Sequence, residues 1–366
     1  MTSAFELKWG ILGCGGIATT FTKDILIDTA SRDVTDVKHV VVAAGTSSSL
    51  DRAKKFLTDC GVPEGTAAAY GSYEALVQDP NVDIIYVATP HSHHFPHVLL
   101  ALNAGKHVLC EKPFTVNAEQ ARILFDIAKQ KNLFLMEAVW TRFFPLSTEV
   151  RELVASGKIG EVKRVLADLS FMNDAENVFP PEHRMVNMDL AGGALLDLGI
   201  YALTWVFQIL YHLDKDAKTP KVVGHVQKYE LTGCDETTTV ICQFPRATGI
   251  AMTSFRISSD IDEKGAAGPA MRIYGTKGEI QVAHPAFRPG KYRVILPEGA
   301  GEWVVKEQVG GGMYYQADAS ARTIRDGKIE CETMPWKETI SVMEVMDEMR
   351  KQADMPYPEA IESTKH

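Results

Sequence analysis

The chain has 366 residues, of which 45% are hydrophobic and 23% charged, and its formal net charge is −9. This length favours two domains, and the acidic balance argues against a nucleic-acid partner, which would require clustered basic residues. Six scattered cysteines without metal-like or paired spacing predict free thiols and a cytoplasmic location.

The first part of the chain alternates short apolar runs with helical patterns. Strands that are separated by helices pair in parallel, with helices on both faces of the sheet. We therefore expect a doubly wound α/β domain of the Rossmann type over residues 1–137. The expected strands are 7–12, 40–44, 82–88, 107–110 and 133–136, and the expected helices are 18–26, 51–60, 72–78, 94–104 and 118–131.

The pattern changes after residue 137. Residues 191–213 are apolar and long enough to span a bilayer. A buried helix is favoured over a membrane span, because the segment contains Asp197 and has no basic flank. Strand-like runs with short turns then favour an open, mostly antiparallel sheet in an α+β domain over residues 138–366. The expected strands are 162–171, 222–231, 237–244, 249–257, 270–274, 279–282, 292–296 and 303–308, and the expected helices are 147–156, 314–326 and 337–352.

The first strand runs into a glycine-rich turn with the pattern GxGxxA. Glycines let the backbone approach a pyrophosphate, and the following helix offers unpaired N–H groups to the anion. At the start of an alternating strand and helix pattern, this turn predicts a dinucleotide site rather than a merely structural turn. Its residues are Gly13, Gly15, Gly16, Ile17 and Ala18.

The end of the second strand bears on the choice of cofactor. An NAD site usually has an acidic residue there for the ribose 2′-OH, and this chain has none. Hydroxyl and guanidinium groups could hold a 2′-phosphate instead, although the serines could also simply cap the next helix. NADP is therefore favoured over NAD, with Thr46, Ser47, Ser48 and Arg52 as its candidate ligands.

Four histidines follow the third strand, at positions 91, 93, 94 and 97. No cysteine or carboxylate accompanies them, so no metal site is predicted. The carboxyl ends of parallel strands are where such sheets bind ligands. We expect Thr89, Pro90, His91 and His94 to line the cofactor cleft.

A Glu-Lys-Pro triplet, Glu111, Lys112 and Pro113, ends the next strand. A lysine at this edge can stand near a nicotinamide and a substrate hydroxyl, where its charge stabilises a developing alkoxide. A solvated surface lysine is an equal alternative from this triplet alone. Pro113 is a candidate for a cis peptide bond.

The order of these motifs, GxGxxA, then TPxxxH, then AGKHVLCEKP, resembles the glucose–fructose oxidoreductase and inositol dehydrogenase family. Residues 135–145 and 192–201 are similar to the branch that contains fungal-type NADP-dependent D-xylose dehydrogenases and dimeric dihydrodiol dehydrogenase. The resemblance implies that Lys112 is the active-site lysine, Tyr201 the catalytic tyrosine and Asp197 the carboxylate of the site. Many NADP-using relatives have arginine where this chain has Ser48.

These positions give a concrete hypothesis for an enzyme that oxidises a small sugar. Tyr201 would take the proton from the anomeric hydroxyl of an aldopyranose, D-xylose or D-glucose, while C1 gives hydride to NADP and a lactone forms. The charge of Lys112 would make the phenol a better base, and Asp197 would orient the sugar or the lysine. The candidate pocket residues, each of which could equally be ordinary packing, are Trp140, Arg142, Phe143, Phe171 and His183.

Other readings remain open. Oxidation of trans-dihydrodiols to catechols could use the same tyrosine and lysine. A non-catalytic protein that senses a dinucleotide, or an oxidoreductase that recycles its cofactor without releasing it, would also fit the fold. An open sheet exposes one face, so we expect a homodimer formed through the sheet of the second domain.

Overall fold

The computed structural model describes residues 4–365, which form two units. The first unit holds the described chain up to Trp140, then Gln308–Trp336, and the last described residues from Thr364. The second holds Thr141–Glu307 and Lys337–Ser363. The division expected from the sequence, at residue 137, assigned 308–336 to the second domain, whereas in the structure this segment returns to the first unit.

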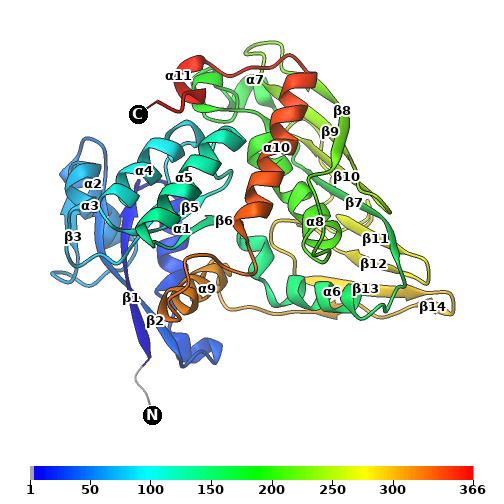
Figure 1. Cartoon of the computed structure of the whole chain (residues 1–366), viewed down its shortest axis with the longest axis horizontal. Helices are drawn as coiled ribbons and strands as arrows, with labels where there is room; N and C mark the ends of the chain where they lie inside the picture. Colours follow the sequence, from blue (N-terminus) through cyan, green and yellow to red (C-terminus); the bar gives the residue numbers. More distant parts are fainter. Residues whose placement is uncertain (1–3, 366) are drawn as a thin grey trace. The chain divides into compact units, whose positions relative to one another are not determined.

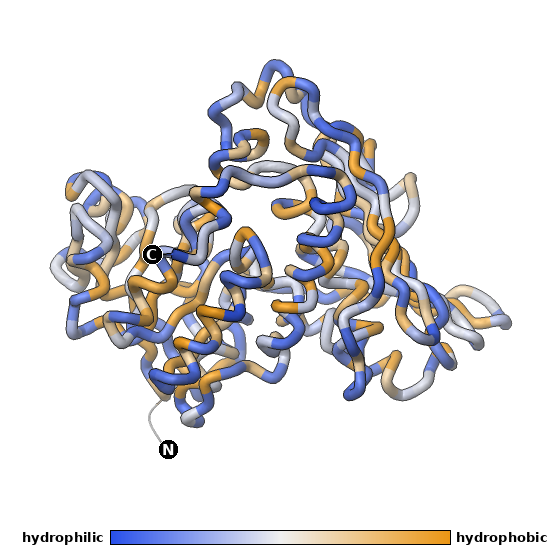
Figure 2. Tube along the Cα trace, turned by 45° about the horizontal axis from the view of Figure 1, so that its top comes forward, coloured by the Kyte–Doolittle hydropathy of each residue, from blue (hydrophilic) through white to orange (hydrophobic). Residues whose placement is uncertain are grey.

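The first unit is built on a parallel sheet of six strands in the order β3-β2-β1-β4-β5-β6. Figure 2 shows apolar, orange segments inside this unit, and all four residues of β4 are buried. This is the Rossmann arrangement that the sequence predicts, and β3 is the strand that sequence patterns missed. The strands are β1 (Phe5–Leu12), β2 (Val37–Gly45), β3 (Ala68–Tyr70), β4 (Ile84–Val87), β5 (His107–Glu111) and β6 (Leu135–Ala138).

Helices join these strands, and three of them begin at polar N-caps, Ser49, Ser72 and Asn117, whose side chains accept a hydrogen bond from the first turn. The helices of this unit are α1 (Gly16–Ile25), α2 (Leu50–Asp59), α3 (Tyr73–Val77), α4 (His94–Asn103), α5 (Ala118–Lys131) and α9 (Tyr314–Arg325), with 3₁₀ turns at Thr29–Arg32 and His91–His93.

Helix α9 belongs to the first unit because charged side chains fasten it there. Asp318, almost fully buried, accepts hydrogen bonds from Arg32 at 2.7 Å and pairs with His39 at 2.9 Å. The Asp24 carboxylate on α1 accepts the N–H groups of Gly311 and Met313, both at 2.8 Å. These contacts join positions almost three hundred residues apart, so no local pattern could reveal them.

The second unit is built on a nine-stranded mixed sheet. Its path is β14-β13-β12-β11-β7-β10-β9-β8, with β15 paired to β13; only β7 and β10 run parallel. This confirms the open, mostly antiparallel sheet. The strands are β7 (Val162–Ser170), β8 (Lys221–Lys228), β9 (Asp235–Gln243), β10 (Thr248–Ser254), β11 (Met271–Gly275), β12 (Glu279–Val282), β13 (Lys291–Leu296), β14 (Gly299–Ala300) and β15 (Val304–Val305).

Helix α8 (Ile200–Leu210) packs against β7 and β10 on one face of this sheet (Figure 1). The helical stretch Met188–Leu210 is long and apolar enough to cross a membrane, but 89% of its most apolar window is buried inside the protein, as in a core helix. The remaining helical elements are η3 (Trp140–Phe143), α6 (Pro145–Ala155), α7 (Ala175–Val178), η4 (Met188–Leu190), a π-helical turn (Leu195–Gly199), α10 (Trp336–Gln352) and α11 (Glu359–Glu362).

Candidate functional site

The glycine turn follows β1 at the carboxyl edge of the parallel sheet. Gly13 has φ +96°, and a Cβ there would meet the carbonyl oxygen of Ala88, after β4, at 3.0 Å. Only glycine suits this backbone conformation. The turn therefore brings β1 and β4 together at the point where the strand order reverses, which is where sheets of this kind bind dinucleotides.

The two later glycines, Gly15 and Gly16, lie in open space. A Cβ on Gly15 or Gly16 would meet no protein atom within 4 Å, so packing inside the chain does not explain why these positions are small. Helix α1 starts there without a side-chain cap, and the side chain of Ile17 is 43% exposed. Open space and uncapped N–H groups are the features that a pyrophosphate-binding turn requires, so these residues fit a dinucleotide.

The residues after β2 divide into two groups. Thr46 is buried, and its hydroxyl both donates to the carbonyl of Ser49 at 2.7 Å and accepts the Ser49 N–H at 2.9 Å, so it shapes the loop. Ser47, Ser48 and Arg52 are exposed. The groups that remain accessible to a 2′-phosphate are therefore two hydroxyls and one guanidinium, while Ser49 caps α2.

His94 joins the loops that follow β4 and β5. Its ring nitrogens lie 2.7 Å from the carbonyl oxygen of Pro113 and 2.9 Å from that of Thr89. Burial, together with the nearby His91, lowers the pKa of His94 to about 3. The ring holds together the two loops that carry Thr89 and Lys112, and the Lys112–Pro113 peptide bond is cis, as the sequence suggested.

The structure also gives the burial or the hydrogen-bond partners of the other residues predicted at this edge of the sheet. Glu111 is buried and accepts a hydrogen bond from the Tyr86 hydroxyl, while His91 is buried and Pro90 exposed. His97 bonds the Thr89 hydroxyl at 3.0 Å. Within residues 4–365 no group of three or more histidine, cysteine or acidic side chains is arranged to hold a metal ion.

In the second unit, Asp197 and Tyr201 lie on one continuous helix. The sequence predicts a regular helix here, but Leu195–Gly199 form a π-helical turn that leads into α8. Such turns widen the helix and are frequent at functional sites. The Asp197 carboxylate is buried and pairs with Arg184 at 3.2 Å, a partner that the sequence analysis did not identify.

An aromatic ring, that of Phe287, lies next to the hydroxyphenyl group of Tyr201. The ring centroid of Phe287 lies 5.9 Å from that of Tyr201 and 6.0 Å from that of Phe171. The carbonyl oxygen of Phe287 accepts a hydrogen bond from Thr141 at 2.6 Å, which fixes its loop. Phe171 contacts Phe287, so its place in the pocket stays a prediction, whereas Phe287 follows a strand end without any recognisable motif.

Two of the expected pocket residues have different surroundings. His183 is half-buried and stacks on Phe179 with ring centroids 4.8 Å apart, and burial lowers its pKa. Arg142 is almost fully buried and its guanidinium pairs with Glu338, which also bonds His212 at 3.0 Å. A role for Arg142 in binding substrate would require this internal ion pair to break.

The candidate catalytic residues belong to different units. Lys112 is half-buried in the first, whereas Asp197 and Tyr201 are in the second. Trp140 is the last residue of the first unit before the chain crosses, and Phe143 is a half-buried residue of the second. The convergence of Lys112 with Tyr201 stays a prediction.

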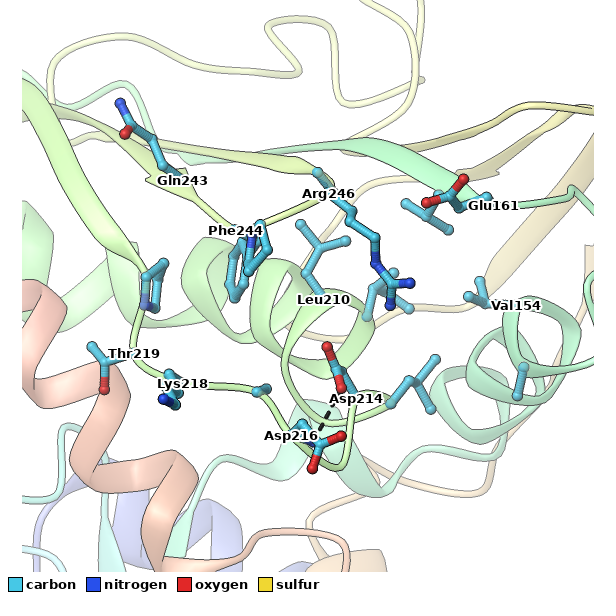
Figure 3. A pocket seen from close by; sticks show the side chains of 18 of the residues that line it. Val154, Glu161, Leu210, Asp214, Asp216, Lys218, Thr219, Gln243, Phe244 and Arg246 are labelled. Carbon is cyan, nitrogen blue, oxygen red and sulfur yellow. Dashed lines mark hydrogen bonds between the residues drawn. The ribbon is translucent and has the colours of Figure 1, made fainter.

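A cavity of about 910 Å³ in the second unit lies elsewhere (Figure 3). It adjoins the C-terminal end of α8, at Ile209 and Leu210, roughly 12 Å along the helix from Tyr201. Its charged lining residues are three acids and three bases, so their charges select no class of ionic ligand. They are Glu161, Asp214, Asp216, Lys218, Lys221 and Arg246.

Comparisons with known proteins cover nearly the whole chain. The chain is 52% identical to a D-xylose 1-dehydrogenase (NADP(+)) from Hypocrea jecorina, over 98% of this chain and 94% of that protein. It is 34% identical to a trans-1,2-dihydrobenzene-1,2-diol dehydrogenase from Bos taurus, over 96% and 98% of the two chains. An aldose–aldose oxidoreductase structure from Caulobacter crescentus shares the fold, with a TM-score of 0.77 at 23% identity over 95% and 98%.

Two family models match in succession. Residues 7–139 match the model of an oxidoreductase family with an NAD-binding Rossmann fold, and residues 147–281 match the GFO/IDH/MocA C-terminal domain. The two matches fall on the parallel sheet and on the larger part of the mixed sheet. The chain therefore belongs to the GFO/IDH/MocA family of oxidoreductases, the family that its motifs resemble.

Proposed function

We propose that this chain oxidises an aldopyranose, with D-xylose as the preferred substrate, at C1 to the lactone, using NADP as the hydride acceptor. The observation that carries the proposal is the 52% identity, over 98% of the chain, to an NADP-dependent D-xylose 1-dehydrogenase. The accessible hydroxyls and guanidinium after β2, without an acidic residue, also support NADP over NAD.

The first unit would bind the cofactor. The pyrophosphate would lie on the N-terminus of α1 over Gly15 and Gly16, and the 2′-phosphate would be held by Ser47, Ser48 and Arg52. When bound, NADP supplies the carbon that accepts hydride. His94 keeps the loops after β4 and β5 in place beside it.

The second unit would bind the sugar and move the proton. As hydride leaves C1, the proton of the anomeric hydroxyl passes to the Tyr201 oxygen, and the C1–O bond becomes the carbonyl of the lactone. The ammonium of Lys112 would stabilise the charge that develops on these oxygens. Asp197, held by Arg184, would accept a hydrogen bond from a sugar hydroxyl.

The test is a steady-state comparison of NADP and NAD reduction with D-xylose, D-glucose and a trans-dihydrodiol. D-Xylose with NADP should give the highest kcat/KM. Tyr201→Phe should lower kcat on the order of a hundredfold or more with the fold intact. Tyr211→Phe, at the far end of the same helix, is the matched control and should behave as wild type. Near-normal turnover by Tyr201→Phe contradicts the assignment, and no turnover of any substrate despite tight NADP binding would favour a sensor.

Dihydrodiol oxidation is the second candidate. The ring of Phe287 lies next to that of Tyr201 and offers an apolar surface that suits a planar cyclic diol as well as the CH face of a sugar. Relatives with this activity are 34% identical over 96% of the chain. Phe287→Ala should raise KM for the diol more than KM for D-xylose if both are substrates.

We infer that the chain forms a homodimer through the sheet face that α8 does not cover. Four apolar residues stand side by side across this face in register: Leu166, Ile250, Ile241 and Val223. They are half-buried or exposed, an arrangement that a soluble protein tends to cover. Ile250→Glu should convert a dimer into a monomer in sedimentation, and a monomeric wild type at micromolar concentration contradicts the inference.

A cytoplasmic location is part of the same proposal. All six cysteines are free thiols, and five of them are buried. Free thiols of this kind are typical of a reducing compartment. Fractionation of cells that express the tagged full chain tests this location, and recovery in a membrane or secreted fraction contradicts it.

A further inference from the structure

Asp235, at the start of β9, is fully buried and points at the helix that carries Asp197 and Tyr201. Its Oδ2 accepts the backbone N–H of Leu195 at 2.6 Å and the hydroxyl of Thr238 at 2.9 Å. The Leu195 N–H belongs to the first turn of that helix, whose N–H groups have no partner within the helix. A carboxylate there forms a charge-assisted hydrogen bond and complements the helix dipole.

The chain before this turn is shaped around the same carboxylate. Gly193 has φ +128°, and a Cβ on it would lie 2.0 Å from Oδ1 of Asp235. Gly192 is equally confined, because its Cβ would meet backbone atoms of Asn187 and Arg184 at 2.8–2.9 Å, and its carbonyl oxygen accepts the Tyr357 hydroxyl at 2.9 Å. The two glycines thus let the backbone pass between Asp235 on one side and the segment that carries Arg184 on the other.

This arrangement links Asp235 to the predicted substrate groups. Arg184 reaches from the confined segment to Asp197. The π-helical turn that starts at Leu195 contains Asp197 and ends two residues before Tyr201. The hydrogen bonds of a π-helical turn span one residue more than those of a regular helix, and such turns are frequent at functional sites. The Leu195 N–H is where a side chain from outside the helix holds this turn.

The charged surroundings agree with an ionised Asp235 at neutral pH. Burial raises its pKa to about 6, while hydrogen bonds from Thr238 and Leu195 and the charge of Arg350 oppose that rise. Tyr357 and Cys234 also face the carboxylate, and burial raises the pKa of both. A buried carboxylate is costly unless it is hydrogen-bonded, yet Oδ1 accepts no hydrogen bond from any residue between 4 and 365. The cost is offset by the bond to the helix.

We propose that Asp235 is a positioning residue for the oxidation described above: through the Leu195 N–H it fixes the π-helical turn and thereby the placement of Asp197 and Tyr201. The inference rests on the proposed function for its kinetic consequences. Its structural part, the control of this turn by Asp235, can be measured without turnover.

The first experiment is Asp235→Asn in the full chain, with Thr238→Val as the matched control. Asp235→Asn replaces the negative charge by a neutral amide, whereas Thr238→Val removes the hydroxyl that donates to the same carboxylate; only the first takes away the charge-assisted bond to the helix. Asp235→Asn should lower kcat for D-xylose on the order of ten- to a hundredfold, with KM for NADP within about twofold of wild type because the proposed cofactor residues belong to the first unit. Thr238→Val should keep kcat near wild type. Equal losses of kcat in both variants, or none in Asp235→Asn, overturn the proposal.

The second measurement is hydrogen exchange of the peptide that covers Leu195–Gly199. Exchange there should speed up in Asp235→Asn and in Gly193→Ala, and the double variant should add little to either single one, since both act on one contact. Unchanged exchange in Asp235→Asn overturns the positioning role even if activity falls. Faster exchange in a protein that turns over neither sugar nor diol would instead support the positioning role and contradict the proposed function.

Discussion

The two units make their contributions to the proposed site in different ways. In the first unit the binding features are mostly backbone: a glycine turn, an uncapped helix start and two loops joined by His94. In the second unit they are side chains from separate elements, with Tyr201 and Asp197 on a helix, Arg184 on a loop and Asp235 on a strand. Backbone features tolerate substitution around them, whereas a network of side chains depends on every partner.

The largest expected effect comes from breaking another buried group of paired side chains in the second unit, at Glu338. This residue, on α10, pairs with Arg142 and His212 in the interior. Glu338→Gln should lower the free energy of unfolding by about 3–5 kcal/mol, because it leaves the Arg142 charge buried without its partner. Thermal or urea unfolding measures this loss.

The matched control for Glu338 is an exposed ion pair of the same unit. Lys163 pairs with Glu161 at 2.8 Å, and both side chains are about half exposed. Lys163→Gln should leave the midpoint of unfolding unchanged. An equally small effect of Glu338→Gln would show that the interior pair contributes nothing beyond a surface pair.

In the first unit, substitutions of two glycines should change different quantities, NADP affinity in one case and the free energy of unfolding in the other. Gly15→Ala places its Cβ in open space, so stability should not change, but affinity for NADP should fall roughly ten- to a hundredfold, since the pyrophosphate would approach the backbone there. Gly13→Ala should cost about 1–2 kcal/mol of stability, because φ is +96°. Titration calorimetry with NADP and thermal unfolding measure the two effects. If the Gly15→Ala variant binds NADP with wild-type affinity, this turn is not part of the NADP site.

The same contrast explains what the sequence could predict. The Rossmann sheet, the glycine turn and the Lys-Pro pair have local signals, because turn, strand and helix follow one another within a few residues. Phe287, Arg184 and the contact between Asp235 and Leu195 have none, since each depends on segments between 13 and 146 residues apart in the chain. The π-helical turn was also invisible, as its sequence reads as an ordinary apolar helix. The pairing of Arg142 with Glu338 also has no local signal, since the two residues are 196 positions apart.

A moderate effect with a defined pH dependence is expected at Asp318, which fastens α9 to the first unit. Burial raises the pKa of this carboxyl, but hydrogen bonds from His39 and Arg32 outweigh it, so the net shift is downward. A lowered pKa means that the unfolded chain binds the proton first as the pH falls, so the stabilisation is complete above about pH 4 and is lost below it. Asp318→Asn should therefore cost roughly 1.5–3 kcal/mol at pH 7 and progressively less in acid. A difference between the two proteins that stays constant down to pH 3 contradicts this account.

The smallest expected effect on stability is at Arg184. A substitution there distinguishes the orientation of the Asp197 side chain, measured by KM, from the stability of the fold. The guanidinium is 52% exposed, so its pair with Asp197 should contribute less than about 1 kcal/mol to unfolding. Arg184→Gln should nevertheless raise KM for D-xylose several-fold, because Asp197 loses a partner that helps to orient it, while KM for NADP stays constant. Added salt should reproduce part of this rise in wild type and none in the variant. If KM for D-xylose does not change, Asp197 is oriented by other groups of the second unit, and Asp235 would then act on the turn as a whole rather than through the pair with Arg184.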